Sequence, residues 1–161
     1  MLRAVALAAA CLALPAAGLA ADQAVQDRPA QDRPAQDRPA VAIAAETAAA
    51  PEGGTRLTVV LSRPVEARAF VMERPDRAIV DLPEVNFQLP PEAGRKRDGL
   101  VASYRYGLFA PGRSRIVIDL AQAATVARVA TTTRPRDGAT LLTVDLARAD
   151  REAFRRGRDR R

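Results

Sequence analysis

Arg115-Ile116-Val117-Ile118-Asp119-Leu120 is the stretch that decides the fold, because apolar side chains recur at every second position. This period places the apolar residues on one face of an extended strand and the charged ones on the other. Residues 57–61, 78–82 and 142–146 alternate in the same way. Pro, Gly and Asp residues that favour turns lie between these runs. The pattern predicts an all-β domain with a half-buried sheet.

The strand-like runs form two similar sets. The aligned segments are Arg56–Ser62 with Arg115–Ala121, Ala67–Ala69 with Ala127–Val129, and Val80–Leu82 with Val144–Leu146. Further strands are expected at about 66–72, 100–106 and 125–132. This twofold repeat predicts two three-stranded units, with the 100–106 strand between them, which pack face to face as a small β-sandwich of two similar sheets.

Charged residues recur at equal spacing on the polar faces of two predicted strands. Arg77 and Asp81 are four residues apart, and so are Arg115 and Asp119. Within one strand this spacing separates them by about 13 Å, so they do not pair directly. Between neighbouring strands, Arg and Asp are expected to alternate as a ladder of ion pairs. We favour this structural role over metal binding, because an Arg beside each Asp repels a cation.

The composition divides the chain into four parts. Residues 1–21 have a basic start, a short apolar run and small residues, which is typical of a cleavable signal peptide. Residues 22–54 contain three Gln-Asp-Arg-Pro-Ala repeats and read as a disordered linker. Residues 55–149 form the predicted β domain, and 150–161 a short helix or basic tail. The apolar run is shorter than a membrane span requires, so no stable transmembrane anchor is expected and the protein is predicted to be periplasmic.

The residue types exclude most enzyme classes. The chain contains no histidine, and Cys11, its one cysteine, lies in the predicted signal peptide. Cys11 is alternatively a lipidation site, although Ala8 stands where such a signal normally has Leu. Without His or Cys, a zinc site is not expected, and we expect no cofactor and no catalytic residues. The net charge of +6 favours an anionic partner, and for an exported protein this is an envelope component rather than nucleic acid.

Arg74-Pro75-Asp76-Arg77-Ala78-Ile79-Val80-Asp81-Leu82-Pro83 resembles the core motif of the AMIN domain. Segments that match the same family follow in its order: Arg56–Leu61, Phe70, Gly99–Val101, Tyr104–Gly107 and Arg115–Leu120. Asn86–Pro90 and the run from Tyr104 to Leu120 are similar to the N-terminal half of alphaproteobacterial N-acetylmuramoyl-L-alanine amidases. Asp150–Phe154 resembles the segment that leads out of the domain in those enzymes. The resemblance covers about residues 55–155.

This resemblance implies a sandwich of two similar four-stranded sheets that binds peptidoglycan and concentrates a wall enzyme at sites such as the division septum. Envelope or divisome proteins are further candidate partners. In the amidases a zinc-dependent catalytic domain follows, whereas this sequence stops at Arg161. The chain is therefore expected to be a truncated or split product or a stand-alone module, and to be non-catalytic either way.

The candidate wall-binding residues are Tyr104, Arg105, Tyr106, Phe109, Arg113 and Arg115. Tyrosine rings stack on sugars, and arginine holds carboxylates in bidentate pairs. Tyr104 and Tyr106 share one strand face, so the alternative is that both pack in the core beside Leu100 and Ala102. Two other functions stay open. One is a protein-binding adaptor of a secretin-type envelope machine that adds a strand at a sheet edge, and the other is an inert remnant of an amidase gene.

Overall fold

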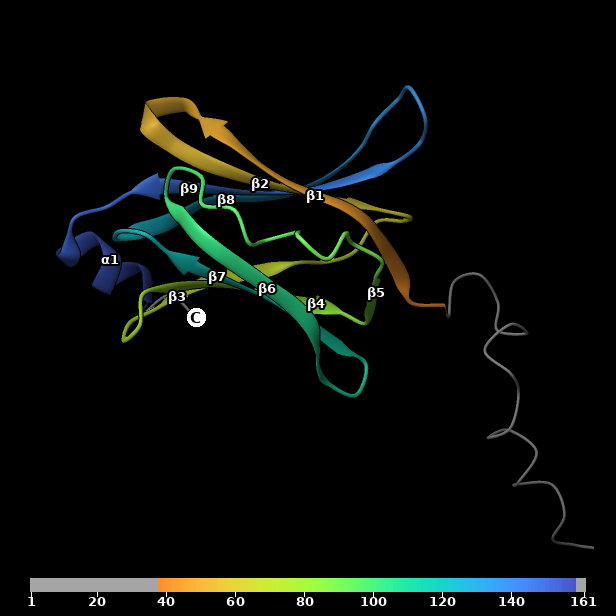
Figure 1. Ribbon diagram of the computed structural model, residues 1–161, viewed down its shortest axis with the longest axis horizontal. Coiled ribbons are helices and arrows are strands. Elements are labelled where there is room, and N and C mark those ends of the chain that lie inside the picture. Colours follow the sequence, from red (N-terminus) through yellow and green to blue (C-terminus); the bar gives the residue numbers. More distant parts are fainter. Residues whose placement is uncertain (1–37, 159–161) are drawn as a thin grey trace, which may run out of the picture. The chain divides into compact units, whose positions relative to one another are not determined.

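Two sheets lie face to face in the computed structural model, which describes residues 38–158 (Figure 1). The strand order is β5-β1-β2-β9-β8 in the five-stranded sheet and β3-β4-β7-β6 in the four-stranded sheet. The predicted all-β sandwich is therefore confirmed. The predicted signal peptide, and the repeats as far as residue 37, lie outside the described residues.

The strands take up most of the described chain. Those of the five-stranded sheet are β1 (Ala40–Ala50), β2 (Gly54–Leu61), β5 (Val85–Phe87), β8 (Ala124–Thr133) and β9 (Thr140–Arg148). Those of the four-stranded sheet are β3 (Arg68–Met72), β4 (Arg77–Pro83), β6 (Val101–Ala110) and β7 (Arg113–Leu120). A 3₁₀ turn, η2 (Pro51–Gly53), joins β1 to β2, and helix α1 (Arg151–Arg158) follows β9.

The core lies between the sheets and is built from the alternating residues of four strands. Buried side chains come from β2 and β9 on one side and from β4 and β7 on the other: Leu57, Val59, Leu61, Leu142, Val144, Leu146, Ala78, Val80, Leu82, Ile116 and Ile118. Leu120, which the pattern also placed inside, is half-buried. Burying a side chain of this size contributes about 1.5–3 kcal/mol, so these strands provide most of the apolar stabilisation.

The two repeats interleave instead of forming one sheet each, which corrects the prediction. β2 of the first repeat pairs with β9 of the second, and β7 of the second pairs with β4 of the first. The connections β2–β3 and β7–β8 both cross from one sheet to the other. Alternation shows which face of a strand is buried, but it does not show which strand lies beside it.

Strand β1 lies within the segment that was predicted to be linker, so the boundary at residue 54 is wrong. Ala40–Ala50 pairs antiparallel with β2, and its first three residues pair parallel with β5. Ala40 and Ala42 are fully buried. Alanine has a low strand propensity and gave no strand signal, but neighbouring strands provide the pairing. Strands β1 and β5 together give this sheet five strands instead of the expected four.

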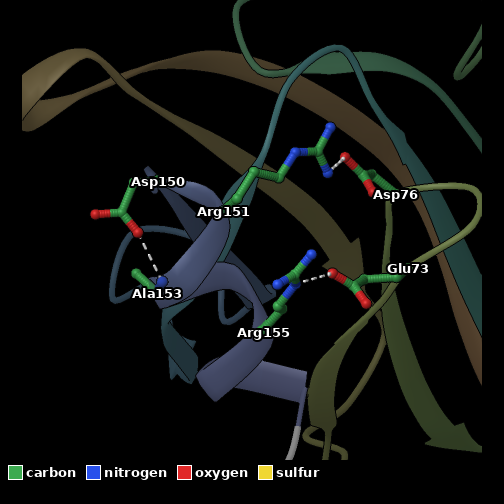
Figure 2. Close-up of polar contacts among 6 residues, drawn as sticks. All are labelled: Glu73, Asp76, Asp150, Arg151, Ala153 and Arg155. Carbon is green, nitrogen blue, oxygen red and sulfur yellow. Dashed lines mark hydrogen bonds and ion pairs between the residues drawn. The ribbon is translucent and has the colours of Figure 1, made fainter.

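Helix α1 packs against β3 and β8, the outer strands of the two sheets (Figure 1). Phe154 of this helix is fully buried. Asp150 caps the helix, because its Oδ1 accepts a hydrogen bond from the backbone N–H of Ala153 at 2.7 Å. Arg151 and Arg155 reach the β3–β4 turn, where they pair with Asp76 at 2.5 Å and Glu73 at 3.4 Å (Figure 2). The helix lies in the segment where a short helix or basic tail was expected.

The segment between β5 and β6 passes close to β6. The backbone N–H of Tyr104 donates to the carbonyl of Gly94 at 2.9 Å. Gly94 has a φ of +83°, and a Cβ atom there would lie 2.1 Å from the Tyr104 carbonyl oxygen. Only glycine fits this approach. The segment therefore limits how far the inner side of β6 is accessible.

Candidate functional site

The two candidate tyrosines point into the sandwich. Tyr104 is 6% exposed, and its hydroxyl donates a hydrogen bond to the carbonyl of Ala45 at 3.2 Å. Burial, together with the nearby Tyr106, raises the pKa of Tyr104. Tyr106 is partly buried, with its ring centroid 4.9 Å from that of Phe87. The structure thus places both rings on the core side of β6, as the alternative interpretation expected.

Arg105, Phe109, Arg113 and Arg115 lie on or beside the outer face of the four-stranded sheet. Arg105, Phe109 and Arg115 line a groove of about 460 Å³ with Arg77, Ile79 and Val117. We call this set of six residues the Phe109 groove. The ring of Phe109 is half exposed and lies beneath two guanidinium groups, with Arg115 3.9 Å and Arg113 5.6 Å from its centroid. Such stacking holds cationic groups at an apolar surface.

Ion pairs cross the same face as the predicted ladder. Arg115 donates two hydrogen bonds to Asp81, from Nε at 2.6 Å and from Nη2 at 3.0 Å. On the same two strands, Arg77 Nε donates to Asp119 at 2.7 Å. The antiparallel register sets Arg77 opposite Asp119 and Arg115 opposite Asp81, which confirms the predicted alternation.

Asp119 receives the largest number of these contacts. Besides Arg77, it accepts a hydrogen bond from the Ser103 hydroxyl at 3.2 Å and lies 3.5 Å from Arg105. Burial raises the pKa of Asp119, but the Arg77 hydrogen bond, the charge of Arg105 and the Ser103 hydrogen bond outweigh it, and the pKa falls below its usual range. The carboxylate is therefore charged at neutral pH and holds the centre of the ladder.

The outer face of the five-stranded sheet carries one equivalent pair. Arg56 on β2 donates two hydrogen bonds to Asp145 on β9, at 2.5 and 2.8 Å. In the repeat alignment, this pair corresponds to Arg115 and Asp81. The position that corresponds to the Arg77–Asp119 pair is occupied by Val60 opposite Leu141. The two faces therefore share one ion pair and differ at the second.

Asp145 gives a pH-dependent contribution to stability. The hydrogen bond from Arg56 lowers its pKa, and burial opposes this only in part. Because the folded-state pKa lies below the unfolded value, the stabilisation is present above about pH 4 and is lost as pH falls through the folded pKa. We expect Asp145→Asn to cost about 1 kcal/mol at pH 7, since Arg56 is 43% exposed, and to flatten the loss of stability that the wild type shows as the pH falls below about 4.

Urea unfolding at several pH values measures this effect. Glu66→Gln removes the same charge from a carboxylate whose side chain is 79% exposed, and it should keep the wild-type pH profile. Equal acid profiles for Asp145→Asn and the wild type would show that the Arg56–Asp145 pair does not contribute.

The site prediction missed three residues of the Phe109 groove. Ile79 and Val117 are apolar residues at outward positions of strands whose alternation was otherwise regular, and this irregularity was the available signal. Arg77 was assigned to the ladder but not to the site. That these three residues meet Phe109 was not predictable from the pattern, because Arg77 and Ile79 lie on β4, Val117 on β7 and Phe109 on β6.

Residues 38–158 hold no group of three or more side chains placed to ligate a metal ion, and no helix among them is long and apolar enough to cross a bilayer. The family model of the AMIN domain matches residues 46–146. A search of curated proteins found no match to the chain.

Proposed function

The chain belongs to the AMIN domain family, and we propose that it is an exported module that binds peptidoglycan through the Phe109 groove. AMIN domains are non-catalytic modules of the periplasm that bind peptidoglycan or envelope machinery. The observation that carries the proposal is the groove on the outer sheet face, which Arg77, Arg105 and Arg115 line together with the half-exposed ring of Phe109.

The chemistry of this face suits an anionic polymer that also offers apolar groups. Peptidoglycan carries carboxylates on its peptides and methyl groups on its alanine residues. Guanidinium groups bind carboxylates through charge-assisted hydrogen bonds, and the half-exposed Phe109 with the partly buried Val117 offers apolar contacts. A small groove of this kind gives modest affinity, which suits a domain that localises a protein on a polymer with many repeated sites.

Two features of the sequence support a role in wall-enzyme localisation. Residues 1–21 have the pattern of a signal peptide, which delivers a protein to the compartment where peptidoglycan lies. The motif from Arg74 to Pro83 and the segment from Asp150 to Phe154 resemble the non-catalytic part of N-acetylmuramoyl-L-alanine amidases. We therefore propose that the domain serves to localise an amidase-type activity.

Cosedimentation of the purified protein with protein-free sacculi tests wall binding. The wild type should sediment with sacculi at about 0.15 M salt, where long-range attraction between exposed charges is largely screened. The double variant Arg105→Ala/Phe109→Ala should lower the bound fraction several-fold, because it removes a guanidinium group and the aromatic surface. The control Arg136→Ala/Ile43→Ala makes the same type of change away from the groove, with Arg136 in the β8–β9 turn and Ile43 exposed on β1.

The control is expected to lose less than the Arg105→Ala/Phe109→Ala variant. If the wild type stays in the supernatant at every salt concentration, wall binding is excluded. If both double variants lose equally, the Phe109 groove is not the binding site.

One observation favours an envelope protein as an alternative partner. Strand β1 extends to Ala50, but β5 pairs with it only from Ala40 to Ala42. In the described chain, the rest of this edge has no paired strand on that side. An extended peptide from a partner adds to such an edge through backbone hydrogen bonds. A protein that cosediments only with an envelope complex and not with bare sacculi would favour this function.

A further inference from the structure

We propose that the Phe109 groove recognises the free carboxylates of peptidoglycan stem peptides and not the glycan strand. This inference rests on the proposed wall binding and specifies its ligand. It assigns separate tasks to the residues of this face: Arg105, with Arg113 beside the groove, binds the carboxylate, and Phe109 with the partly buried Val117 contacts the alanine methyl groups of the peptide.

The groove lacks the side chains that glycan recognition uses. Sugars are held by exposed aromatic faces together with side-chain oxygens that accept bonds from hydroxyl groups. Tyr104 and Tyr106 are turned toward the core, and the face of Phe109 has the Arg115 guanidinium 3.9 Å from its centroid. The nearest carboxylates, Asp81 and Asp119, already accept hydrogen bonds from Arg115 and Arg77. The acceptors that a sugar would need are thus engaged.

Arg105 is the arginine of the groove best placed to bind a new carboxylate. Its side chain is 63% exposed, and its guanidinium lies 3.5 Å from Asp119, which Arg77 and Ser103 hold more closely at 2.7 and 3.2 Å. Asp119 therefore keeps two partners if Arg105 turns to a ligand. The planar guanidinium matches a carboxylate with two parallel hydrogen bonds, which gives both affinity and orientation.

Arg77 and Arg115 have a different task in the same groove. Each is held by an aspartate across the β4–β7 pairing, at 2.7 and 2.6 Å. They neutralise the two aspartates and stay in place while Arg105 moves, so the net positive charge of the rim comes from Arg105 and Arg113. Arg113, which is exposed above Phe109, extends the cationic rim toward the β6–β7 turn. A peptide carboxylate entering over Phe109 meets Arg113 and Arg105 in turn.

The opposite face of the sandwich argues for the same assignment. There the positions equivalent to Arg77 and Asp119 are Leu141 and Val60, and the remaining pair, Arg56 with Asp145, is closed by two hydrogen bonds. The approximate twofold repeat thus yields two outer faces with unlike chemistry. Within residues 38–158, the arginines of the five-stranded face, Arg56 and Arg128, both act on Asp145, whereas the four-stranded face sets the exposed Arg113 beside the ring of Phe109.

Direct titration of the purified protein distinguishes peptide from glycan. The probes are a free stem tetrapeptide, the same peptide with its carboxylates converted to amides, and a peptide-free glycan fragment. Chemical shifts of the backbone amides of β6 and β7 report binding. We expect the free peptide to change these chemical shifts and the amidated peptide to bind with an affinity at least about tenfold lower. The glycan fragment should cause no chemical-shift change at the same concentration.

Variants then assign the carboxylate contact. Arg105→Ala should weaken the tetrapeptide about tenfold, which corresponds to about 1.4 kcal/mol, and Arg105→Lys should recover only part of this because it keeps the charge without the bidentate geometry. Arg136→Ala removes an equal charge from the β8–β9 turn and should leave the affinity unchanged. Unfolding curves check that each variant is folded.

The outcomes separate the two proposals. If intact sacculi bind but the glycan fragment binds as well as the tetrapeptide, or amidation has no effect, wall binding stands and carboxylate recognition is overturned. Equal loss for Arg105→Ala and Arg136→Ala would also overturn it, because only net charge would matter. If sacculi themselves do not bind, both proposals fail.

Discussion

A variant that begins at Thr55 should show no cooperative unfolding transition, because it lacks strand β1. That strand pairs with β2 along most of its length and carries the one described strand partner of β5. Its removal uncovers the core beneath Ala40 and Ala42 and breaks the backbone hydrogen bonds of Val41 with Ser62 and of Ala42 with Gln88. The expected loss exceeds about 5 kcal/mol, which equals the whole stability of many domains.

Circular dichroism during thermal unfolding measures this loss. The matched control begins at Arg38 and keeps every residue that the structure describes at this end of the chain. The control should unfold in one transition, as small single domains do. A variant beginning at Thr55 that unfolds at the same temperature as the control would mean that β1 does not belong to the folded unit.

Phe154→Ala should lower the free energy of unfolding by about 3–4 kcal/mol. Phe154 is fully buried on the side where α1 packs against β3 and β8, and truncation of a buried phenylalanine removes apolar contacts and leaves a cavity. For a domain of this size, the change lowers the melting temperature by roughly 10 °C or more. Chemical and thermal unfolding should agree on the loss.

Arg155→Ala is the neighbouring control for Phe154→Ala. It lies on the same helix, its side chain is 65% exposed, and its ion pair with Glu73 is long, at 3.4 Å. Figure 2 shows this pair reaching from α1 to the β3–β4 turn. An exposed pair of this kind contributes less than about 1 kcal/mol. A loss of less than 1 kcal/mol for Phe154→Ala would show that the helix is only loosely attached in solution.

The buried residues of the central strands were predictable because alternation reports burial directly. Leu57, Val80 and Ile118 point inward, as the period of two required. The ladder was predictable for the same reason, since Arg77 and Asp119 occupy outward positions on strands that the repeat made similar. These inferences needed only the geometry of a single strand.

Strand pairing and the N-terminal boundary were not predictable in this way. Ala40–Ala50 has no polar–apolar alternation that identifies a strand, and its stability comes from β2 and β5, which are distant in sequence. The exchange of strands between the two repeats depends on where the connections after β2 and β7 lead. Nothing in the composition of those connections specifies the sheet that follows.

The candidate site was predictable in part. The sequence placed Tyr104 and Arg105 on opposite faces of one strand, and the structure keeps that relation, with the tyrosine inside and the arginine outside. It did not show which face remains accessible, because that depends on the second sheet. Nor did it bring Ile79 and Val117 to Phe109, since the groove joins residues from strands β4, β6 and β7.

The interleaving of the two repeats has a consequence for how the chain acquires its structure during synthesis. A nascent chain emerges from its N-terminus, and β2 and β4 appear well before their partners β9 and β7. β1–β2 and β3–β4 pair within the first half and β7 completes the four-stranded sheet, but the five-stranded sheet needs the pairing of β2 with β9 and stays incomplete until the β8–β9 hairpin has been made. Such long-range pairing slows folding. A precursor that folds slowly stays unfolded for longer, and the unfolded state is the one that translocation across a membrane requires.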